Sequence, residues 1–539
     1  MTSESAVPWD FDIIQIGFGP VGQTMAALLG RRGHRVGVFE RWPTAYPLPR
    51  AGHVDHEVMR ILQAVGAAHE FEPYAIPVPD YDWLNGNGDV LLHLDWNQPT
   101  PSGWKSDYLM YQPDLQDVLL AAVRRHPSVE VYGGWNATRI THHPDHVEVT
   151  LAHGTVADGT WRPDGVTRTV TAAWLIGADG ANSVVRQAAG VGWDDLGFEE
   201  DWLVVDLELH DPDIRIDMPE AGQYCDPDRP VSLFRRLGRA HSRWEFMLLP
   251  GEEADRMTQE ARCWELLARW KITPADATVI RRTVYTFRSL LAESFRRDRT
   301  LLIGDAAHLM PPFMGQGMCS GIRDAANLAW KLDLVLTGRC GDSLLDTYTR
   351  ERRPHVHSVT TTSMELGRIV CISDPEEAAA RDHAFLTGDV PPPPPFPVLT
   401  DGLLHRDANG TPTGPAGTLG VQPRVHWQGR TGLFDDVVGN GWTLMTTVPP
   451  GQLPLDDDQF AFLRTLDTRI VHVTRARIPG AVIDMDADAT RWLADHEAEL
   501  ALVRPDFYVF GTARADQADA LVDSLRHQLR PHLSEASRT

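Results

Sequence analysis

A glycine-rich turn close to the N-terminus constrains the fold of this chain more than any other feature. An apolar run at 11–16 is followed by Gly17, Gly19 and Gly22 in the order G-x-G-x-x-G, and then by a predicted helix with one apolar side. The first glycine permits a tight turn, the second lets a pyrophosphate approach the backbone, and the third lets helix and strand pack closely. With an apolar strand after the helix, the pattern predicts a Rossmann-like βαβ unit that binds a dinucleotide.

The end of the second strand of this unit carries a further indication. Glu40 follows Gly22 by 18 residues and can accept hydrogen bonds from the 2′-hydroxyl of an adenosine ribose. An acidic side chain there disfavours a 2′-phosphate, although the neighbouring Arg41 weakens that argument.

Two later segments repeat the pattern of a strand that leads to an acid and a glycine. An apolar strand is predicted before Asp179 and Gly180, and another before Gly304 and Asp305. Asp305 can accept a hydrogen bond from a ribose or ribityl hydroxyl. The alternative for both aspartates is turn or helix-capping duty.

The loop that follows the last of these segments contains Pro311, Gly315, Gly317 and Met318, and a helix is predicted after it. The glycines let the backbone come close to a ligand. The exposed N–H groups and the dipole of the helix favour negative charge, such as that on the N1–C2=O edge of a reduced flavin. A plain strand–loop–helix crossover is the alternative interpretation.

Charge and cysteine content exclude several classes of partner. With 50 Lys and Arg against 74 Asp and Glu, the net charge is −24, which argues against nucleic acid and against an anionic membrane surface. The five cysteines are scattered without a C-x-x-C, so we expect a reducing cytoplasm, no disulfide framework and no metal site. The N-terminus does not read as a signal peptide, and no run of about twenty apolar residues predicts a membrane span.

Changes of pattern along the chain predict two domains, one inserted into the other, and a third after a linker. We expect a dinucleotide-binding domain at 8–75, 103–187 and 281–369, and a β-rich substrate domain at 76–102 and 188–280. Five consecutive prolines place an extended linker at 370–397. Residues 398–539 predict a small α/β domain without cysteine, which excludes a dithiol redox role.

These motifs together carry a family resemblance. The order and spacing of the three glycine and acid segments resemble single-component flavin-dependent aromatic hydroxylases, the group of para-hydroxybenzoate hydroxylase. A closer resemblance, to 3-(3-hydroxyphenyl)propionate hydroxylases, rests on YPLPR at 46–50, QPD at 112–114, CDPDRP at 225–230, FMLLPGE at 246–252 and GQGMCSGIRDAANLAWK at 315–331. The segment 504–508 resembles the C-terminal domain of phenol hydroxylases. Cys319 is a departure, because many relatives carry Asn there.

The resemblance implies an α/β fold class: a Rossmann-like FAD-binding domain with an inserted β-sheet substrate domain and a C-terminal thioredoxin-like α/β domain. It implies that Gly17, Gly19, Gly22, Glu40 and the adjacent Arg41 surround the ADP half of FAD, and that Arg50 and Gln112 contact the cofactor. Asp305 would bind the ribityl–pyrophosphate region, and Pro311 and 315–318, with Gly315, Gly317 and Met318, would lie against the flavin ring. Asp179 and Gly180 would line the FAD and help admit the nicotinamide of NADH or NADPH, which has no domain of its own.

The activity implied by the resemblance is hydroxylation of a phenolic substrate, similar to 3-(3-hydroxyphenyl)propionate, with NAD(P)H and O2 through a flavin C4a-hydroperoxide. The site must help the substrate to lose its phenolic proton, because a phenol with a pKa near 10 is protonated at pH 7, at a cost of roughly 4 kcal/mol. Asp55 matches an aspartate that phenol hydroxylases place at the substrate hydroxyl. The alternative, that Asp55 caps the helix starting near His56, has equal weight.

Other candidates for substrate contact lie on the strand 243–249. Arg243, Glu245 and Met247 share one face of it, so one of them, or Arg235 or Arg236, can meet a substrate carboxylate. A solvated strand face is the interpretation that we favour for this strand.

Three functions remain open at this point. The first is the hydroxylase of a phenolic acid, the second is a tailoring hydroxylase or epoxidase of a polycyclic or quinone-like metabolite, and the third is a non-catalytic FAD redox sensor. Expected partners are a small aromatic substrate and O2, and a homodimer is also left open.

Overall fold

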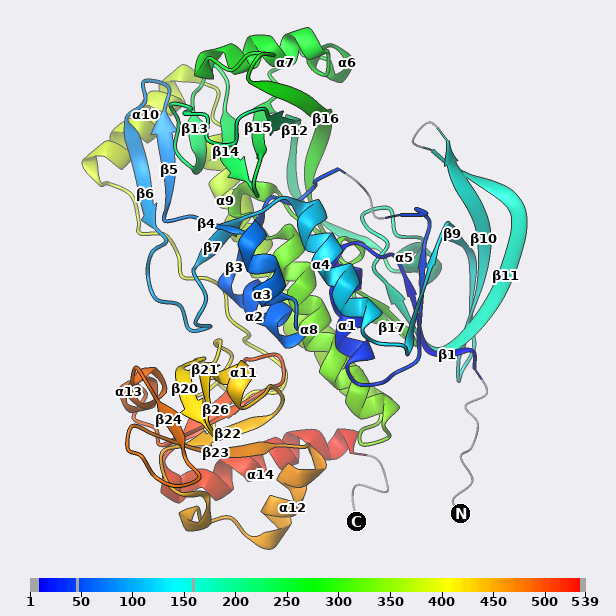
Figure 1. Ribbon diagram of the computed structural model, residues 1–539, viewed down its shortest axis with the longest axis vertical. Helices are drawn as coiled ribbons and strands as arrows, with labels where there is room; N and C mark the ends of the chain where they lie inside the picture. Colours follow the sequence, from blue (N-terminus) through cyan, green and yellow to red (C-terminus); the bar gives the residue numbers. More distant parts are fainter. Residues whose placement is uncertain (1–8, 45–47, 158–159, 534–539) are drawn as a thin grey trace.

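The computed structural model describes residues 9–44, 48–157 and 160–533 of the 539-residue chain. Tyr46 and Pro47 of the YPLPR segment, residue 8 and the tail after 533 lie outside these described residues. Three bodies are stacked along the long axis (Figure 1): a twisted sheet at the top, an α/β body in the middle and the C-terminal domain at the bottom. Within the described ranges, no helix is long and apolar enough to cross a membrane.

The middle body is built on a mostly parallel sheet in the order β17-β18-β11-β1-β2-β8, with β10 and β9 attached to β11. Its strands are β1 (Phe11–Ile16), β2 (Val36–Glu40), β8 (Val129–Gly133), β9 (Trp135–His142), β10 (Val147–Ala157), β11 (Thr160–Gly177), β17 (Arg296–Arg297) and β18 (Thr300–Leu302). Strand β1 pairs in parallel with β2 and β11, and β11 with β18. Their carboxyl ends therefore meet at one edge, where ligands bind in sheets of this type.

The middle body also contains the helices that pack against this sheet. They are α1 (Pro20–Gly30), α2 (His56–Ala64), α3 (Ala68–Phe71), α4 (Gln112–Arg124), α5 (Val184–Ala188), α8 (Gly317–Leu336) and α9 (Asp346–Val370). Short 3₁₀ turns are η1 (Glu72–Tyr74), η3 (Gly304–Ala306), η4 (Pro312–Met314) and η5 (Asp342–Leu345). A small sheet of β3 (His53–Asp55), β7 (Asp107–Leu109) and β4 (Ile76–Pro77) joins this body to the next.

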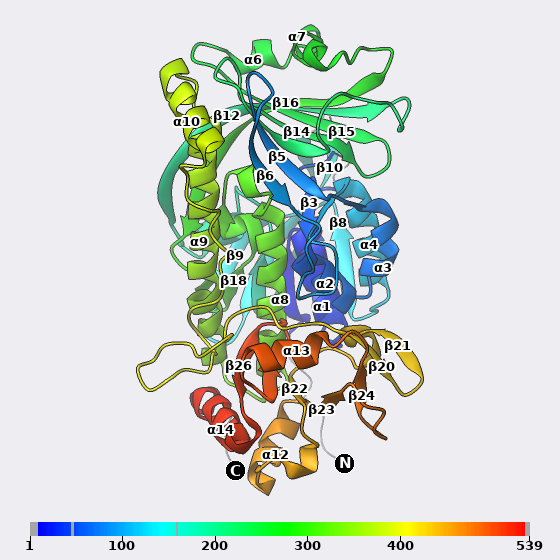
Figure 2. The same ribbon diagram turned by 90° about the vertical axis from the view of Figure 1, so that its left-hand side faces the viewer.

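The upper sheet runs in the order β19-β16-β12-β15-β14-β13-β5-β6. Its strands are β5 (Asp80–Asn85), β6 (Val90–Asp95), β12 (Trp193–Leu209), β13 (Ala221–Cys225), β14 (Val231–Leu237), β15 (His241–Met247), β16 (Ala277–Ala292) and β19 (His308–Leu309). Helices α6 (Ala254–Met257) and α7 (Glu260–Leu267), with η2 (Ala268–Trp270), cover its outer face. The inner face looks toward the middle body (Figure 2). The substrate domain was predicted to end at residue 280, but strand β16 runs past this point, so the upper sheet continues to Ala292.

The segment predicted as an extended linker contains a helix, α10 (Pro375–Thr387). Asp374 caps it by accepting from the N–H groups of Glu376 and Glu377, and Gly388 ends it at φ +75°. An aspartate cap, a proline at the first position and acids in the first turn are strong helix starts. The five prolines begin only after this helix, and there the chain has no regular structure.

The C-terminal domain has a sheet in the order β21-β20-β24-β23-β22-β25-β26. Its elements are β20 (Arg424–Trp427), β21 (Arg430–Leu433), α11 (Phe434–Val437), β22 (Thr443–Thr446), α12 (Asp457–Thr465), β23 (Arg469–Thr474), β24 (Val482–Asp484), α13 (Asp488–Asp495), β25 (Leu500–Val503), β26 (Val509–Ala513) and α14 (Ala518–Leu529), with η6 (Pro450–Gln452), η7 (Ala515–Gln517) and η8 (Arg530–His532). Strands β22 and β23 are parallel around α12, and β25 and β26 return antiparallel beside β22 before α14. This is the thioredoxin-like arrangement that the resemblance implied.

Candidate active site

The three glycine and acid segments converge at the carboxyl edge of the middle sheet. The N–H of Ala178 donates to the carbonyl of Ile16 at 2.8 Å, which joins the exit of β11 to that of β1. The N–H of Ile303 donates to the carbonyl of Gly177 at 3.0 Å, which joins β18 to β11. The chain therefore holds three turns, far apart in sequence, side by side.

The glycines of the first turn divide into two kinds. Gly17 has φ +100°, and a Cβ there would lie 2.2 Å from the carbonyl oxygen of Ala178. A Cβ on Gly22 would lie 2.6 Å from the carbonyl oxygen of Gly17. Gly19 is different, because no protein atom lies within 4 Å of its Cβ position, immediately before helix α1. Open space at a helix N-terminus fits the pyrophosphate of a dinucleotide.

Glu40 reaches into this turn from the end of β2. Its carboxylate accepts from the N–H of Phe18 at 2.8 Å and from the N–H of Trp42 at 3.0 Å. The side chain is thus fixed beside the glycine turn, while Arg41 points to solvent with its guanidinium 5.8 Å from the Trp42 ring.

In the second turn, Asp179 makes local hydrogen bonds of the turn and helix-capping kind, which was the alternative interpretation of this residue. Its carboxylate accepts from the hydroxyl of Ser183 at 2.5 Å and from the N–H of Val185 at 3.2 Å, at the start of α5. Burial raises the pKa of Asp179, and these hydrogen bonds oppose that rise. Gly180 follows at φ +79° with open space around its Cβ position.

The third turn leads from Gly304 toward helix α8. The Cβ position of Gly304 is 3.3 Å from Val21 of α1, so the first and third turns pack on each other. The carboxylate of Asp305 is exposed to solvent, yet the surrounding protein raises its pKa, with Arg50 and His308 opposing that effect. A carboxylate that is enclosed by protein but reached by solvent is available to a ligand.

The loop before α8 has an open helix N-terminus. Gly315 turns the chain at φ +64°, and α8 begins at Gly317 with no side-chain cap. The N–H groups of Gly317 and Met318 therefore suit a negatively charged ligand edge, and the dipole of the 20-residue helix adds to that preference. Pro311, earlier in the loop, is buried, and its carbonyl accepts from Ser363 at 2.7 Å.

Gln112 organises the segment that faces this loop. Its side-chain carbonyl accepts from the N–H of Arg50 at 2.9 Å and from the N–H of Ala51 at 2.8 Å. The backbone of Arg50 is therefore fixed by Gln112, whereas its side chain is exposed.

The inner face of the upper sheet lies over this region and is held at two points. Trp202 of β12 contacts Phe313 of η4 with ring centroids 5.7 Å apart, and Met247 pairs with Trp202 across the sheet. Four residues back along β15, Arg243 donates to the carbonyl of Arg50 at 2.7 Å. Glu245 lies between these two anchors on the same face, because side chains alternate along a strand. The inner face and the loop before α8 thus border one site.

Comparison with known proteins decides the family. The sequence matches the family model of an FAD binding domain over residues 10–363, and that of the HcaD C-terminal domain over 417–528. A probable NADH-specific resorcinol 4-hydroxylase of Rhodococcus jostii is 38% identical over 93% of this chain and 92% of its own length. This chain belongs to the FAD-dependent aromatic hydroxylases.

Further relatives agree with this membership. A 3-(3-hydroxy-phenyl)propionate/3-hydroxycinnamic acid hydroxylase of Klebsiella pneumoniae is 32% identical over 99% of the chain and 98% of its own length. The structure of aklavinone-11 hydroxylase with FAD and aklavinone, at 24% identity, covers 97% of this chain and 99% of its own with a TM-score of 0.76, which shows a shared fold. The predicted fold class, family and FAD cofactor are thereby confirmed.

In this hydroxylase the predicted solvated face of β15 is wrong. Arg243 and Glu245 are only 3% and 5% exposed, because the face is covered by the middle body. Arg243 donates to the carboxylate of Asp206 at 2.6 Å as well as to backbone carbonyls, so its hydrogen-bonding capacity is largely used. Burial raises the pKa of Glu245 to about 7, although Arg243 opposes that rise.

Asp55 takes the capping role in this hydroxylase. It accepts from the N–H of Val58 at 3.0 Å at the start of α2, from Gln316 at 3.0 Å, and from Arg323 of α8 at an ion-pair distance of 2.5 Å. Burial alone would raise its pKa, but Arg323, His56 and the Val58 N–H hold the pKa below the usual range. A carboxylate with this low pKa is a poor acceptor for a phenolic proton.

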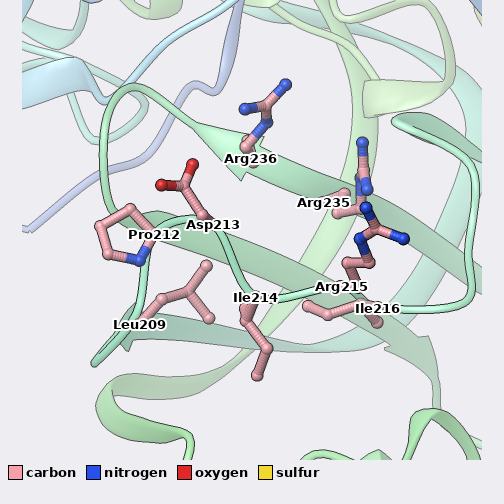
Figure 3. Close-up of a pocket in the computed structure, with 8 residues that line it drawn as sticks. All are labelled: Leu209, Pro212, Asp213, Ile214, Arg215, Ile216, Arg235 and Arg236. Carbon is pink, nitrogen blue, oxygen red and sulfur yellow. The ribbon is translucent and has the colours of Figure 1, made fainter.

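The other predicted candidates lie elsewhere. Arg235 and Arg236 both form ion pairs with Glu220 and line a cavity of about 100 Å³ beside the loop after β12 (Figure 3). None of the residues proposed to surround the cofactor lines it. Within the described ranges, no group of three or more His, Cys, Asp and Glu side chains is arranged to hold a metal ion.

Sequence reasoning missed a set of polar and aromatic side chains that border the site. His53 of β3 lies 2.7 Å from Asp107, and its ring is 6.2 Å from that of Trp96, which stacks on Tyr81 at 4.9 Å. The hydroxyl of Tyr81 accepts from Gln223 at 2.7 Å. The partners of His53 come from segments that no local pattern in the sequence links to it.

Proposed function

We propose that this enzyme hydroxylates a phenol that carries no carboxylate, using NADH, O2 and bound FAD. FAD supplies hydride acceptance and oxygen activation. The support for NADH and for a resorcinol-like substrate is the 38% identical relative named as a probable NADH-specific resorcinol 4-hydroxylase. A relative at 32% identity is named for a phenolic acid, so the substrate class needs an argument from this chain's own residues.

The charge balance of the inner face carries that argument. Arg243 and Arg281 are the arginines of β15 and β16 buried at this face, and Asp206 lies 2.6 Å from the first and 3.9 Å from the second. Arg243 is also 3.6 Å from Glu245. When Glu245 is ionised, two cations therefore meet two carboxylates. Binding a carboxylate substrate here would add an anion next to Glu245 without a cation to match it, which is costly in a buried site.

Glu245 is the group that we assign to the phenolic hydroxyl. The residues paired with Glu245 on the two neighbouring strands are Val204 and Ser232, so neither of these cross-strand neighbours is a cation. A pKa of about 7 is closer to that of a phenol than an ordinary carboxyl pKa is, which favours proton transfer at neutral pH. Trp202 and Phe313 are buried and exclude water from this region, which strengthens the electrostatic interaction between Glu245 and a phenolic hydroxyl.

For the cofactor we propose the arrangement implied by the sequence. The open space at Gly19 before α1 would hold the pyrophosphate, and Glu40 the adenosine ribose. Asp305 would accept from the ribityl chain, and the N–H groups of Gly317 and Met318 would face the flavin ring. Cytoplasmic location and a homodimer stay predictions.

The test is a comparison of substrates with the purified, FAD-loaded chain. NADH and NADPH oxidation is followed with resorcinol, with 3-(3-hydroxyphenyl)propionate and with a polycyclic quinone, and the products are identified by mass. We expect resorcinol to stimulate NADH oxidation and to gain one oxygen atom. Preference for the phenolic acid would overturn the neutral-phenol assignment, and NADH oxidation indifferent to all aromatics would favour a redox sensor.

A further inference from the structure

We propose that His53 is held as an imidazolium behind the loop before α8, and that its charge raises the reduction potential of the bound FAD. This inference rests on the proposed placement of the flavin ring against residues 315–318. His53 then acts on the cofactor through that loop and is a positioning residue rather than a proton donor to the substrate.

Both ring nitrogens of His53 face hydrogen-bond acceptors. Nε2 lies 2.7 Å from the carboxylate of Asp107, and Nδ1 lies 3.3 Å from the carbonyl oxygen of Gly315. A neutral imidazole carries a proton on one nitrogen only, so donation to both acceptors requires the protonated ring. Burial alone would lower the pKa of His53, but the hydrogen bond and the charge of Asp107 raise it well above its usual value.

The ring is packed directly on the glycine loop. A Cβ on Gly315 would lie 2.7 Å from Nδ1 of His53, and His53 is only 7% exposed. Two residues further along the chain, Gly317 begins α8 without a side-chain cap. The positive end of the His53–Asp107 pair is therefore directed at the carbonyl of Gly315, two residues before the start of α8.

The other polar groups around His53 do not reverse the direction of the His53–Asp107 pair. Asp107 lies on the far side of the ring and accepts from Ser106. The carboxylate of Asp55 is paired with Arg323 and Gln316, and Cys319 packs against the carbonyl of His53 at 3.8 Å. A flavin that gains negative charge on reduction is stabilised more in its reduced than in its oxidised state by a nearby fixed cation.

Because both nitrogens are engaged, His53 has no free atom for acid–base chemistry with the substrate. Its contribution is a fixed charge in a site of low dielectric, which needs no rearrangement when the flavin is reduced. That role predicts a change in flavin properties that are measurable without any aromatic substrate.

The experiment uses the full-length, FAD-loaded chain with His53→Gln and Asp107→Asn. Sulfite adds to oxidised flavin more tightly when positive charge lies near the ring, so its dissociation constant is measured together with the two-electron midpoint potential. We expect His53→Gln to weaken sulfite binding about tenfold, equivalent to a potential about 30 mV more negative. Asp107→Asn should shift both values in the same direction by less, because the ring loses the proton that Asp107 stabilises while the negative charge of Asp107 is removed at the same time.

The matched control is His34→Gln. His34 forms a buried pair with Asp333 at 2.9 Å, the same chemistry outside the loop before α8. We expect its sulfite affinity and potential to equal those of the wild type.

Unchanged sulfite affinity and potential in His53→Gln would overturn the proposal, as would equal shifts in His34→Gln. Loss of FAD at saturating cofactor from both His53→Gln and Asp107→Asn would also overturn it, because the pair would then hold the loop instead of tuning the flavin. A wild-type protein that binds FAD but hydroxylates no phenol would defeat the proposed function and leave this test intact.

Discussion

Arg504 of the C-terminal domain donates to Glu351 of helix α9 across 2.5 Å, and both side chains are completely buried. Glu351 also accepts from Lys331 at 2.7 Å and from Asn327 at 2.8 Å, both on α8. Helix α8 is the one that begins at the proposed flavin loop. The C-terminal domain is therefore attached by buried charge to the helix that we propose borders the cofactor, which gives a domain without cysteine a structural role.

Replacing Arg504 tests the strength of that attachment. Arg504→Met leaves the carboxylate of Asp506 buried without its ion-pair partner and leaves Glu351 with Lys331 as its remaining cation. Breaking a buried pair in this way costs about 3–5 kcal/mol. We expect a lower urea midpoint by far-UV circular dichroism. Arg350→Met is the control, because the Arg350–Asp401 pair is exposed and contributes about 0–1 kcal/mol. Equal midpoints for the two variants would contradict the assignment.

The same cluster predicts the response to acid. Arg504 and Lys331 outweigh burial and lower the pKa of Glu351 to about 2, from an ordinary value of 4.5. A lowered carboxyl pKa contributes stability above pH 4.5 that is lost as the pH falls toward 2. In Glu351→Gln this contribution is absent, so we expect a smaller loss of urea stability between pH 5 and pH 3 than in the wild type. A wild-type slope in the variant would refute the prediction.

Glu245 predicts the pH dependence of catalysis. With a pKa of about 7, it must lose its proton before it can accept one from a phenol. We expect kcat/KM for phenol-stimulated NADH oxidation to rise with pH through about 7 in the wild type. Glu245→Gln should lower kcat/KM by about 10²–10⁴-fold and remove that rise.

A stability measurement separates this role from misfolding. Because its folded pKa is raised, Glu245 opposes folding increasingly as the pH rises from 4.5 to 7. Glu245→Gln should therefore be more stable than the wild type at pH 8, by about 1–3 kcal/mol, and equal to it at pH 4.5. Reduced stability at pH 8 would show that the carboxylate is a structural partner of Arg243.

The two kinds of glycine in the first turn predict opposite defects. Gly17→Ala adds a Cβ 2.2 Å from a backbone carbonyl at φ +100°, so we expect an unstable apoprotein, by about 3 kcal/mol or more. Gly19→Ala meets no protein atom within 4 Å and should leave apoprotein stability within about 1 kcal/mol while weakening FAD binding at least tenfold. Thermal unfolding and FAD titration measure both, and a Gly19→Ala protein with unchanged FAD affinity would count against the pyrophosphate site.

Local patterns were enough to predict the cofactor fold. The turn at 17–22, the acid at 40 and the later glycine and acid segments each depend on neighbours in sequence, because φ angles, strand ends and helix starts are local properties. The helix α10 was missed although its signals, Asp374 and Pro375, are equally local, because the prolines after it dominated the interpretation.

The group that we propose to meet the substrate could be singled out only from the tertiary structure. Sequence left Asp55 equally suited to capping and to catalysis, and its partner Arg323 stands 268 positions away. The same holds for His53, whose partner Asp107 lies on another strand. The sequence by itself determined which cofactor the chain is built for. Which carboxylate is neutralised and which keeps a pKa near 7 depends on burial and distant charges, and these exist only once the sheets pack together.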